Sequence, residues 1–159
     1  MIWAAIGLDV KTPLVFVPRD PDSENNGYTA QSYLITLEEG LIPVYEPGRP
    51  FQQDNARIHV ARISQEWFET HGIWVIKWPP CSPDLNPIEH AWKALKQQLY
   101  QLYPNIDELK DNQADIAILK ARIEEAWAHV DQALIRRLVA SIPDRLQACR
   151  RAHGWYTKY

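Results

Sequence analysis

Residues 51–56 of the chain read FQQDNA and residues 78–92 read WPPCSPDLNPIEHAW, and these two blocks decide the fold. Asp54 ends a short apolar segment with strand character, and Glu89 lies in the first turn of a predicted helix. Thirty-four residues, positions 55–88, separate them. Carboxylates on separate rigid elements can supply the oxygen ligands of the divalent metals that cut or join phosphodiesters. Asp54 and Glu89 are therefore candidates for one shared metal site.

Each of the two acids also has a purely structural interpretation, which the residues alone leave open. Asp54 fits a turn in which an aspartate side chain bonds the backbone two residues further on. Glu89 fits the third position of a helix capped by Asn86, where glutamate can bond back to the amide of the capping residue. Spacing by itself does not separate a metal ligand from a turn or cap residue.

Hydrophobic periodicity, prolines and glycines predict alternating strands and helices before residue 103. The predicted strands cover residues 1–6, 13–17, 51–53 and 73–76, and a turn at 7–12 makes the first two a hairpin. One predicted helix runs from a Thr29 cap to before Pro43, a second covers 60–70, and a third begins at Asn86. Residues 79–83 are expected to be irregular, because proline fixes φ and lacks an amide donor.

The last third of the chain is predicted to be helical. Asp115 and Asp131 are expected to cap two helices, and a last helix is expected from Ser141 to His153, with Gly154 as its stop. The expected fold class is α/β. It is predicted to be one domain over residues 1–159, with an α/β core at 1–103 and a helical part at 104–159.

Composition limits the classes of function. Of the 159 residues, 46% are hydrophobic, which is enough for one globular core. The net charge of −3 excludes a basic field over the whole chain, so any contact with DNA must be local or rely on metal. The two cysteines lack metal-ligand spacing. No apolar run approaches the ~20 residues of a membrane span, and the start of the chain lacks a signal-peptide pattern.

The two blocks resemble the catalytic core of mariner-superfamily DDE transposases. FQQDNA, with His59 following, is similar to the block around the family's second acidic residue. WPPCSPDLNPIEHAW is similar to the block around the third, at an agreeing separation. The Ile2-Trp3 strand and GWYTKY at residues 154–159 resemble the family as well, the latter its fungal branch. The resemblance therefore covers nearly the whole chain.

The resemblance implies an RNase H-like mixed sheet flanked by helices, with Asp54 and Glu89 as catalytic ligands of Mg²⁺ or Mn²⁺. It implies DNA as the partner. The lack of a membrane span and of a signal-peptide pattern indicates a nuclear or cytosolic protein, and the nucleus is the expected location. The ancestral activity that the resemblance implies is metal-dependent cleavage of DNA strands at transposon ends, followed by strand transfer. Asp84, inside the second block, is expected to organise the loop rather than bind metal.

The sequence departs from the family pattern at two points. Arg57 stands where the family usually has proline. A solvated arginine is the default expectation, and a changed turn or an added phosphate contact are the alternatives. The family's first acidic residue lies on a strand upstream of Ile2-Trp3, so it is expected before Met1. Asp9 is an early candidate substitute, but it falls in a predicted turn. The chain as given is therefore expected to lack the central first strand and to be catalytically impaired, and whether it is an enzyme stays open.

Basic and histidine residues near the two acids are candidate contacts to nucleic acid. His59 is expected either to brace Asp54 or to contact DNA, and a zinc site that joined it to His90 would lack a fourth ligand. Lys93 and Lys96 follow Glu89 on the same helix face, suited either to phosphates or to an exposed Glu–Lys pair. The C-terminal third is locally basic, as a solvated face or a DNA flank, through Arg136, Arg137, Arg145, Arg150, Arg151 and Lys158.

A second hypothesis is non-enzymatic. A sheet without its first strand leaves edges that can pair with another chain. The chain would then serve as an interaction module that binds nucleic acid or forms a homodimer through the exposed sheet edge.

Overall fold

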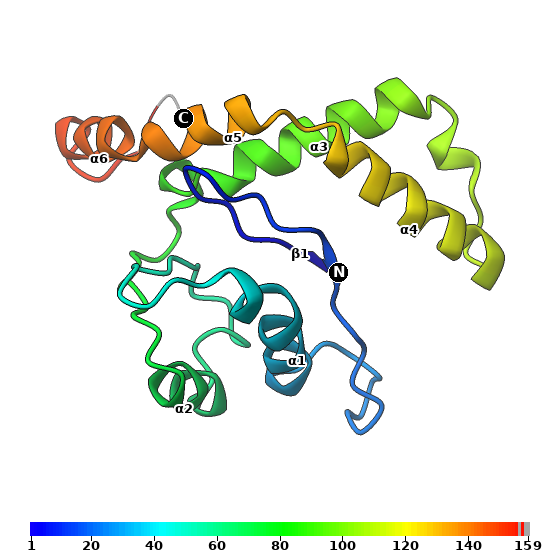
Figure 1. Ribbon diagram of the computed structural model, residues 1–159, viewed down its shortest axis with the longest axis horizontal. Coiled ribbons are helices and arrows are strands. Elements are labelled where there is room, and N and C mark those ends of the chain that lie inside the picture. Colours follow the sequence, from blue (N-terminus) through cyan, green and yellow to red (C-terminus); the bar gives the residue numbers. More distant parts are fainter. Residues whose placement is uncertain (156, 158–159) are drawn as a thin grey trace. The chain divides into compact units, whose positions relative to one another are not determined.

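The computed structural model describes residues 1–155 and 157, which form two compact units (Figure 1). The first unit consists of Met1–Ala4 and Leu14–Ser82. The second consists of Ala5–Pro13 and the chain from Pro83 onward. No helix within the described residues is long and apolar enough to cross a membrane.

The sheet of the first unit is smaller than predicted. β1 (Ile2–Trp3) pairs antiparallel with β2 (Val15–Phe16), with Ile2 opposite Phe16 and Trp3 opposite Val15. The strands predicted at 51–53 and 73–76 are wrong as regular strands, because they meet only in a parallel bridge between Phe51 and Val75.

Two backbone hydrogen bonds make this bridge. Phe51 donates its N–H to the Trp74 carbonyl at 2.7 Å and accepts from the Ile76 N–H at 2.8 Å. The segment 73–76 is not buried as predicted, since Trp74 is 62% exposed. A short segment with one partner gains too little pairing to extend into a strand.

Two helices supply most of the first unit. α1 (Ala30–Gly40) begins at the predicted Thr29 cap, whose hydroxyl accepts from the Ser32 N–H at 3.3 Å. A 3₁₀ turn, η1 (Ile42–Val44), contains the proline predicted to end the helix. Gly40 ends α1 against β1, and a Cβ there would lie 2.4 Å from Cζ3 of Trp3, so glycine is needed for this close approach. α2 (Arg62–Thr70) matches the helix predicted at 60–70.

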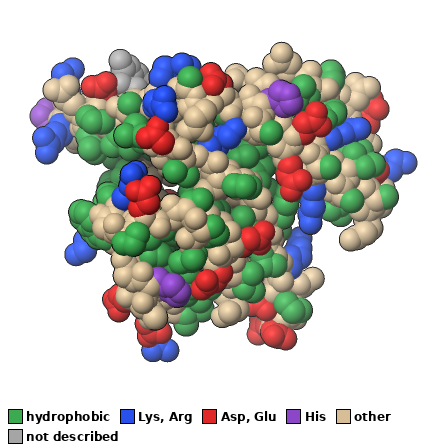
Figure 2. All heavy atoms as spheres, viewed as in Figure 1, with side chains coloured by type: hydrophobic (Ala, Val, Ile, Leu, Met, Phe, Trp, Pro, Cys, Tyr) green, Lys and Arg blue, Asp and Glu red, His purple; other side chains and the backbone are tan. Residues whose placement is uncertain are grey.

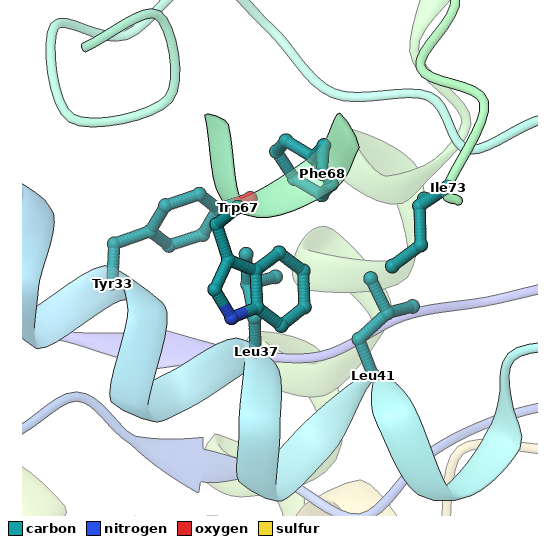
Figure 3. Close-up of a cluster of buried hydrophobic side chains, with 6 residues drawn as sticks. All are labelled: Tyr33, Leu37, Leu41, Trp67, Phe68 and Ile73. Atoms are coloured by element: carbon teal, nitrogen blue, oxygen red, sulfur yellow. The ribbon is translucent and has the colours of Figure 1, made fainter. Parts of the chain in front are cut away.

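α1 and α2 face each other across one apolar cluster. Figure 3 shows its side chains pointing toward one another from α1, α2 and the segment after α2. Trp67 meets Phe68 edge to face at 5.3 Å between ring centroids, and its indole N–H donates to Glu38 at 2.8 Å. The cluster consists of Tyr33, Leu37, Leu41, Trp67, Phe68 and Ile73.

The second unit is helical apart from the hairpin turn that it takes from the N-terminal region. Within the described residues its elements are η2 (Pro83–Leu85), α3 (Ile88–Leu102), η3 (Ile106–Glu108), α4 (Gln113–Ala128), α5 (Gln132–Ala140) and α6 (Ile142–Arg151). Pro83, expected to be irregular, opens η2, because the first position of a turn needs no amide donor.

The caps of the C-terminal helices were predicted in part. Asp131 caps α5 as predicted, accepting from the Ala133 N–H at 2.9 Å. The cap predicted for α4 is wrong: Asn112 accepts from the Asp115 N–H at 3.0 Å. Asp115 bonds back instead, to the amide of Lys110 and the side chain of Asn112, both at 2.9 Å. α6 ends at Arg151, two residues before the predicted end.

The predicted hairpin turn is present and is hydrogen-bonded to the C-terminal end of α4. Gly7 donates its N–H to the Val10 carbonyl at 2.7 Å. The Lys11 ammonium donates to the carbonyls of Trp127 and Val130 at 2.8 and 2.6 Å, where α4 ends and leaves carbonyls without helical partners. The Trp127 indole N–H donates to the Thr12 carbonyl at 2.7 Å. Lysine at this position thus caps a helix that lies far along the chain.

Candidate active site

Asp54 lies in the loop that follows the bridge residue Phe51, with its side chain 59% exposed. Its Oδ1 accepts from the Ala56 N–H at 3.0 Å, so the structural interpretation of Asp54 as a turn residue is observed. Oδ1 also lies 2.6 Å from Nδ1 of His59. Oδ2 makes no hydrogen bond to the described residues. The turn therefore fixes the carboxylate and leaves one oxygen available for a ligand.

The buried side chain of Tyr33 packs against His59, the residue that contacts the Asp54 carboxylate. The Tyr33 ring lies against the His59 ring at 4.4 Å between centroids, and its hydroxyl donates to Oε1 of Gln53. Burial, and then the charge of Asp54, raise the pKa of Tyr33 above its usual value, so the hydroxyl keeps its proton. The predicted bracing of Asp54 by His59 is present in the structure, and DNA contact by His59 stays a prediction.

Asp54 borders a hollow of about 430 Å³ within the first unit. Its lining combines polar side chains, among them Asp54 and His59, with apolar ones that include Phe68 and Trp78. Asn55 holds one wall in place by donating to the Trp78 carbonyl at 2.9 Å. Asp54 therefore lies beside space that a ligand can enter.

Glu89 is exposed in the first turn of α3, as predicted. The capping-box alternative is not observed, because the Asn86 amide donates to the Pro83 carbonyl at 3.0 Å and not to Glu89. Asn86 itself accepts from the Ile88 N–H at 3.3 Å, so its predicted capping role is met one residue from the helix boundary. The Glu89 carboxylate makes no hydrogen bond to any residue that the structure describes. Both of its oxygens are available for a ligand.

The loop before Glu89 rests on α6. The expectation that Arg145 belongs to a basic surface is wrong, because the residue is 1% exposed. The guanidinium donates to the Asp84 carbonyl at 2.7 Å and to the Ser141 hydroxyl at 2.8 Å. The Asp84 carboxylate accepts from the Thr157 hydroxyl at 2.9 Å, so Asp84 organises the loop as predicted.

His90 touches the same guanidinium, at 3.4 Å from its Nδ1. Burial, and then the charges of Arg145 and Lys93, lower the pKa of His90. The neutral ring can accept at Nδ1, which matches a neighbour that only donates. No sequence pattern points to the contact between Arg145 and His90. The spacing of Ser141 and Arg145, four residues or one helical turn, is a local sign of their own hydrogen bond.

The remaining candidate residues stay predictions as DNA contacts. Arg57, Lys93 and Lys96 are exposed. Figure 2 shows basic and acidic side chains interspersed on the face in view, which agrees with local rather than chain-wide contact. Arg136 pairs with Asp9 at 2.6 Å in the hairpin turn. Lys158 lies outside the described residues, as do two others of the GWYTKY stretch.

Asp54 belongs to the first unit and Glu89 to the second, so their convergence on one site stays a prediction. His59 and His90 are divided in the same way. Across residues 1–155 and 157 no three His, Cys, Asp or Glu side chains gather as a metal-binding group. The available oxygens of Asp54 and Glu89 are hard donors, and such donors fit Mg²⁺ or Mn²⁺ better than zinc.

Replacing His59 by phenylalanine is expected to weaken Mn²⁺ binding by about 10–100-fold, the usual cost of losing a group that orients a metal ligand. Phenylalanine keeps the ring against Tyr33 but cannot hold Oδ1 of Asp54. Electron paramagnetic resonance of free Mn²⁺ measures the affinity. His59→Asn, whose amide can still donate to Asp54, is the matched control and should lose less. Equal affinity in His59→Phe and the parent protein would refute the bracing role.

Comparisons with known proteins show the family to which the chain belongs. The family model described as DDE superfamily endonuclease matches residues 24–110. The Tc1 transposase of Caenorhabditis elegans is 37% identical over 112 residues, 70% of this chain and 38% of the relative. The Tc3 transposase of the same species is 33% identical over 158 residues, 97% of this chain and 44% of the relative. The chain thus spans less than half the length of these relatives.

Solved structures agree on the fold. One of the Mos1 transposase catalytic domain with raltegravir and Mg is 22% identical, with a TM-score of 0.66 over 93% of this chain and 76% of that one. A Mos1 transposase paired-end complex with the left transposon end is 22% identical, with a TM-score of 0.68 over 98% and 44%. These matches show the RNase H-like fold of such catalytic domains, here with a reduced sheet. The chain belongs to the DDE superfamily endonucleases, in the group of Tc1 and mariner transposases. The predicted family is therefore confirmed.

Proposed function

We propose that the chain is part of a transposase catalytic domain in which Asp54 and Glu89 bind Mg²⁺ or Mn²⁺ and DNA is the substrate. The observation that carries the proposal is that both carboxylates have oxygens available for a ligand. Asp54 keeps Oδ2, and Glu89 keeps both oxygens, without hydrogen bonds to the described residues. The related structures that include Mg and a transposon end support the same choice of metal and partner. A nuclear location is part of the proposal, because the substrate would be genomic DNA.

The chain's own residues have distinct tasks in this function. The turn at Ala56 and the contact with His59 hold the Asp54 carboxylate in one orientation. Glu89 offers a longer side chain from a helix end. Lys93 and Lys96 lie one and two turns further along α3, and in this proposal they bind phosphates of the DNA backbone. Bound divalent ions would supply the activation of water or a 3′-hydroxyl and the neutralisation of the leaving oxygen.

The polypeptide of these 159 residues, taken by itself, is proposed to cleave DNA weakly at most. Within the described residues neither Asp54 nor Glu89 has two further metal-binding side chains beside it. Fewer carboxylates bind a metal pair less tightly, because ligand charge and number set the affinity. In this scheme the ancestral activity is strand cleavage and strand transfer at transposon ends.

A metal titration combined with plasmid nicking tests the proposal. Mn²⁺ should broaden the amide resonances next to Asp54 and Glu89 in a spectrum of the ¹⁵N-labelled chain, and added Mg²⁺ should reverse the broadening. Supercoiled plasmid should show slow nicking or none with either metal. Broadening confined to other acidic residues, such as those near Asp9, would contradict the metal assignment. Rapid nicking that Asp54→Asn abolishes would contradict the proposed weakness while supporting the site.

The open edges of the sheet favour a second candidate function, that of a non-catalytic module that pairs with another chain. Within residues 1–155 and 157, β1 has β2 as its one partner strand, and residues 51–53 pair only through the Phe51 bridge. The side-chain amide of Gln52 is buried without a partner in the described residues. Unpaired edges of this kind accept an added strand. A homodimer through this edge predicts a mass that rises with concentration in light scattering, and a constant monomer mass would rule it out.

A further inference from the structure

Arg145 is a buried cation whose contacts lead to the residue proposed as the second metal ligand. It lies on α6, and the residue is 1% exposed. Its guanidinium spans the Asp84 carbonyl, the Ser141 hydroxyl and Nδ1 of His90, at 2.7, 2.8 and 3.4 Å. One of these partners belongs to α6's own cap, one to the loop before α3, and one to α3 itself.

The loop transmits this anchoring to Glu89 through a short series of bonds. Asp84 belongs to η2, whose Leu85 is buried, and the next residue, Asn86, is buried as well. The Asn86 amide donates to the Pro83 carbonyl, and its side chain accepts from the Ile88 N–H. Glu89 is the next residue along the helix. The backbone that carries Glu89 is therefore fixed at the point where Arg145 holds the loop.

A second contact reaches the same loop from the end of the chain. The Thr157 hydroxyl donates to the Asp84 carboxylate at 2.9 Å. Arg145 thus meets the backbone of Asp84, and Thr157 meets its side chain. Two C-terminal residues act on one loop residue.

We infer that Arg145 is a positioning residue for Glu89, which it serves by locking the loop from Pro83 to Asn86 against α6. Burying a charge costs free energy unless several hydrogen bonds compensate it. An apolar side chain could fill the same volume without that cost, so packing alone does not explain an arginine at this position. The planar guanidinium reaches three acceptors at once, which lysine cannot do. The inference rests on the proposed function in one respect, that Glu89 is a metal ligand.

The test uses the whole 159-residue chain with Arg145→Met and Arg145→Lys. Hydrogen exchange of the Asn86 and Ile88 amides reports the loop without metal, and it should be about tenfold faster in Arg145→Met. Mn²⁺ broadening at the amides around Glu89 reports the site, and affinity there should fall by about 10–100-fold. Arg145→Lys keeps the charge but not all three bonds, so both effects should be intermediate. Arg150→Met, an exposed arginine on the same helix, is the matched control and should leave both readouts unchanged.

A purely structural role would lower the denaturation midpoint while the folded protein kept its Mn²⁺ affinity and its slow exchange at Asn86 and Ile88. That result in folded Arg145→Met overturns the inference. If Arg145→Met does not fold, the same result in Arg145→Lys overturns it. Glu89→Gln is measured in parallel. If it leaves the Mn²⁺ broadening intact, the proposed function fails, and the exchange rates still decide whether Arg145 holds the loop.

Discussion

Replacing Leu37 by alanine is expected to lower the free energy of unfolding by about 3–5 kcal/mol. Leu37 is 0% exposed and lies in α1 amid the cluster that joins α1 to α2 (Figure 3). Removing its branched end loses the transfer free energy of the buried carbons and leaves a cavity, since neighbouring aromatic rings cannot collapse fully into the space. Urea denaturation, followed by the fluorescence of Trp67 and the other tryptophans, measures the change.

The control for this prediction lies on the same helix. Ile35 is 48% exposed, so Ile35→Ala removes a similar volume without opening a cavity, and it should change stability by about 0.5 kcal/mol or less. A loss below about 1 kcal/mol in Leu37→Ala would show that the cluster is not a close-packed core. A loss as large in Ile35→Ala would show that the effect comes from the helix rather than from burial.

The sequence predicted helices well where their ends are set locally. Thr29 and Asp131 cap their helices because a side-chain oxygen and an amide two or three residues away are the whole requirement. The prediction that Asp115 caps α4 was wrong for an equally local reason. Asn112 stands three residues earlier and takes the capping amide, which leaves Asp115 to bond backward. Two polar residues three apart compete for one cap, and periodicity does not rank them.

The strands were predicted poorly because strand pairing is not a local property. Residues 73–76 are apolar, and three of the four are β-branched. Trp74 is nevertheless exposed, and among the described residues only Phe51 forms a strand-type bridge with the segment. Whether such a segment extends depends on a neighbour far away in the sequence. The hairpin at 7–12 was predictable, since its two strands meet through one short turn.

The candidate site also contains residues that the local sequence identifies and one residue that it does not. Asp54 and Glu89 could be found from the motif, and His59 from its place five residues after Asp54. Arg145 could not, because its partners Asp84 and His90 lie more than fifty residues away, and an arginine in a basic stretch is expected at the surface. The structure also shows which of the two local structural roles is present, while the metal-ligand role of both acids stays a prediction. The Asx turn at Asp54 is present and the capping box at Glu89 is absent.

The convergence of the two acids predicts a reciprocal effect between distant positions. Asp54→Asn is expected to abolish Mn²⁺ broadening around Glu89 as well as around residue 54, and Glu89→Gln is expected to abolish broadening around Asp54. An ion held by both carboxylates loses most of its affinity when either ligand becomes an amide, because amides lack the charge that sets the affinity of such sites. Residues that act as one unit are strongly non-additive, so the double variant should bind little more weakly than either single one.

Two independent weak sites would give the opposite pattern. Each substitution would then remove broadening only near itself, and the losses in the double variant would add. Asp9→Asn provides the matched control, since Asp9 is an exposed carboxylate engaged with Arg136. It should change neither site, and its effect combined with Asp54→Asn should be additive. Loss at one position alone in both single variants would show that Asp54 and Glu89 do not share an ion, and the family resemblance would then extend to the fold but not to the metal chemistry of this chain.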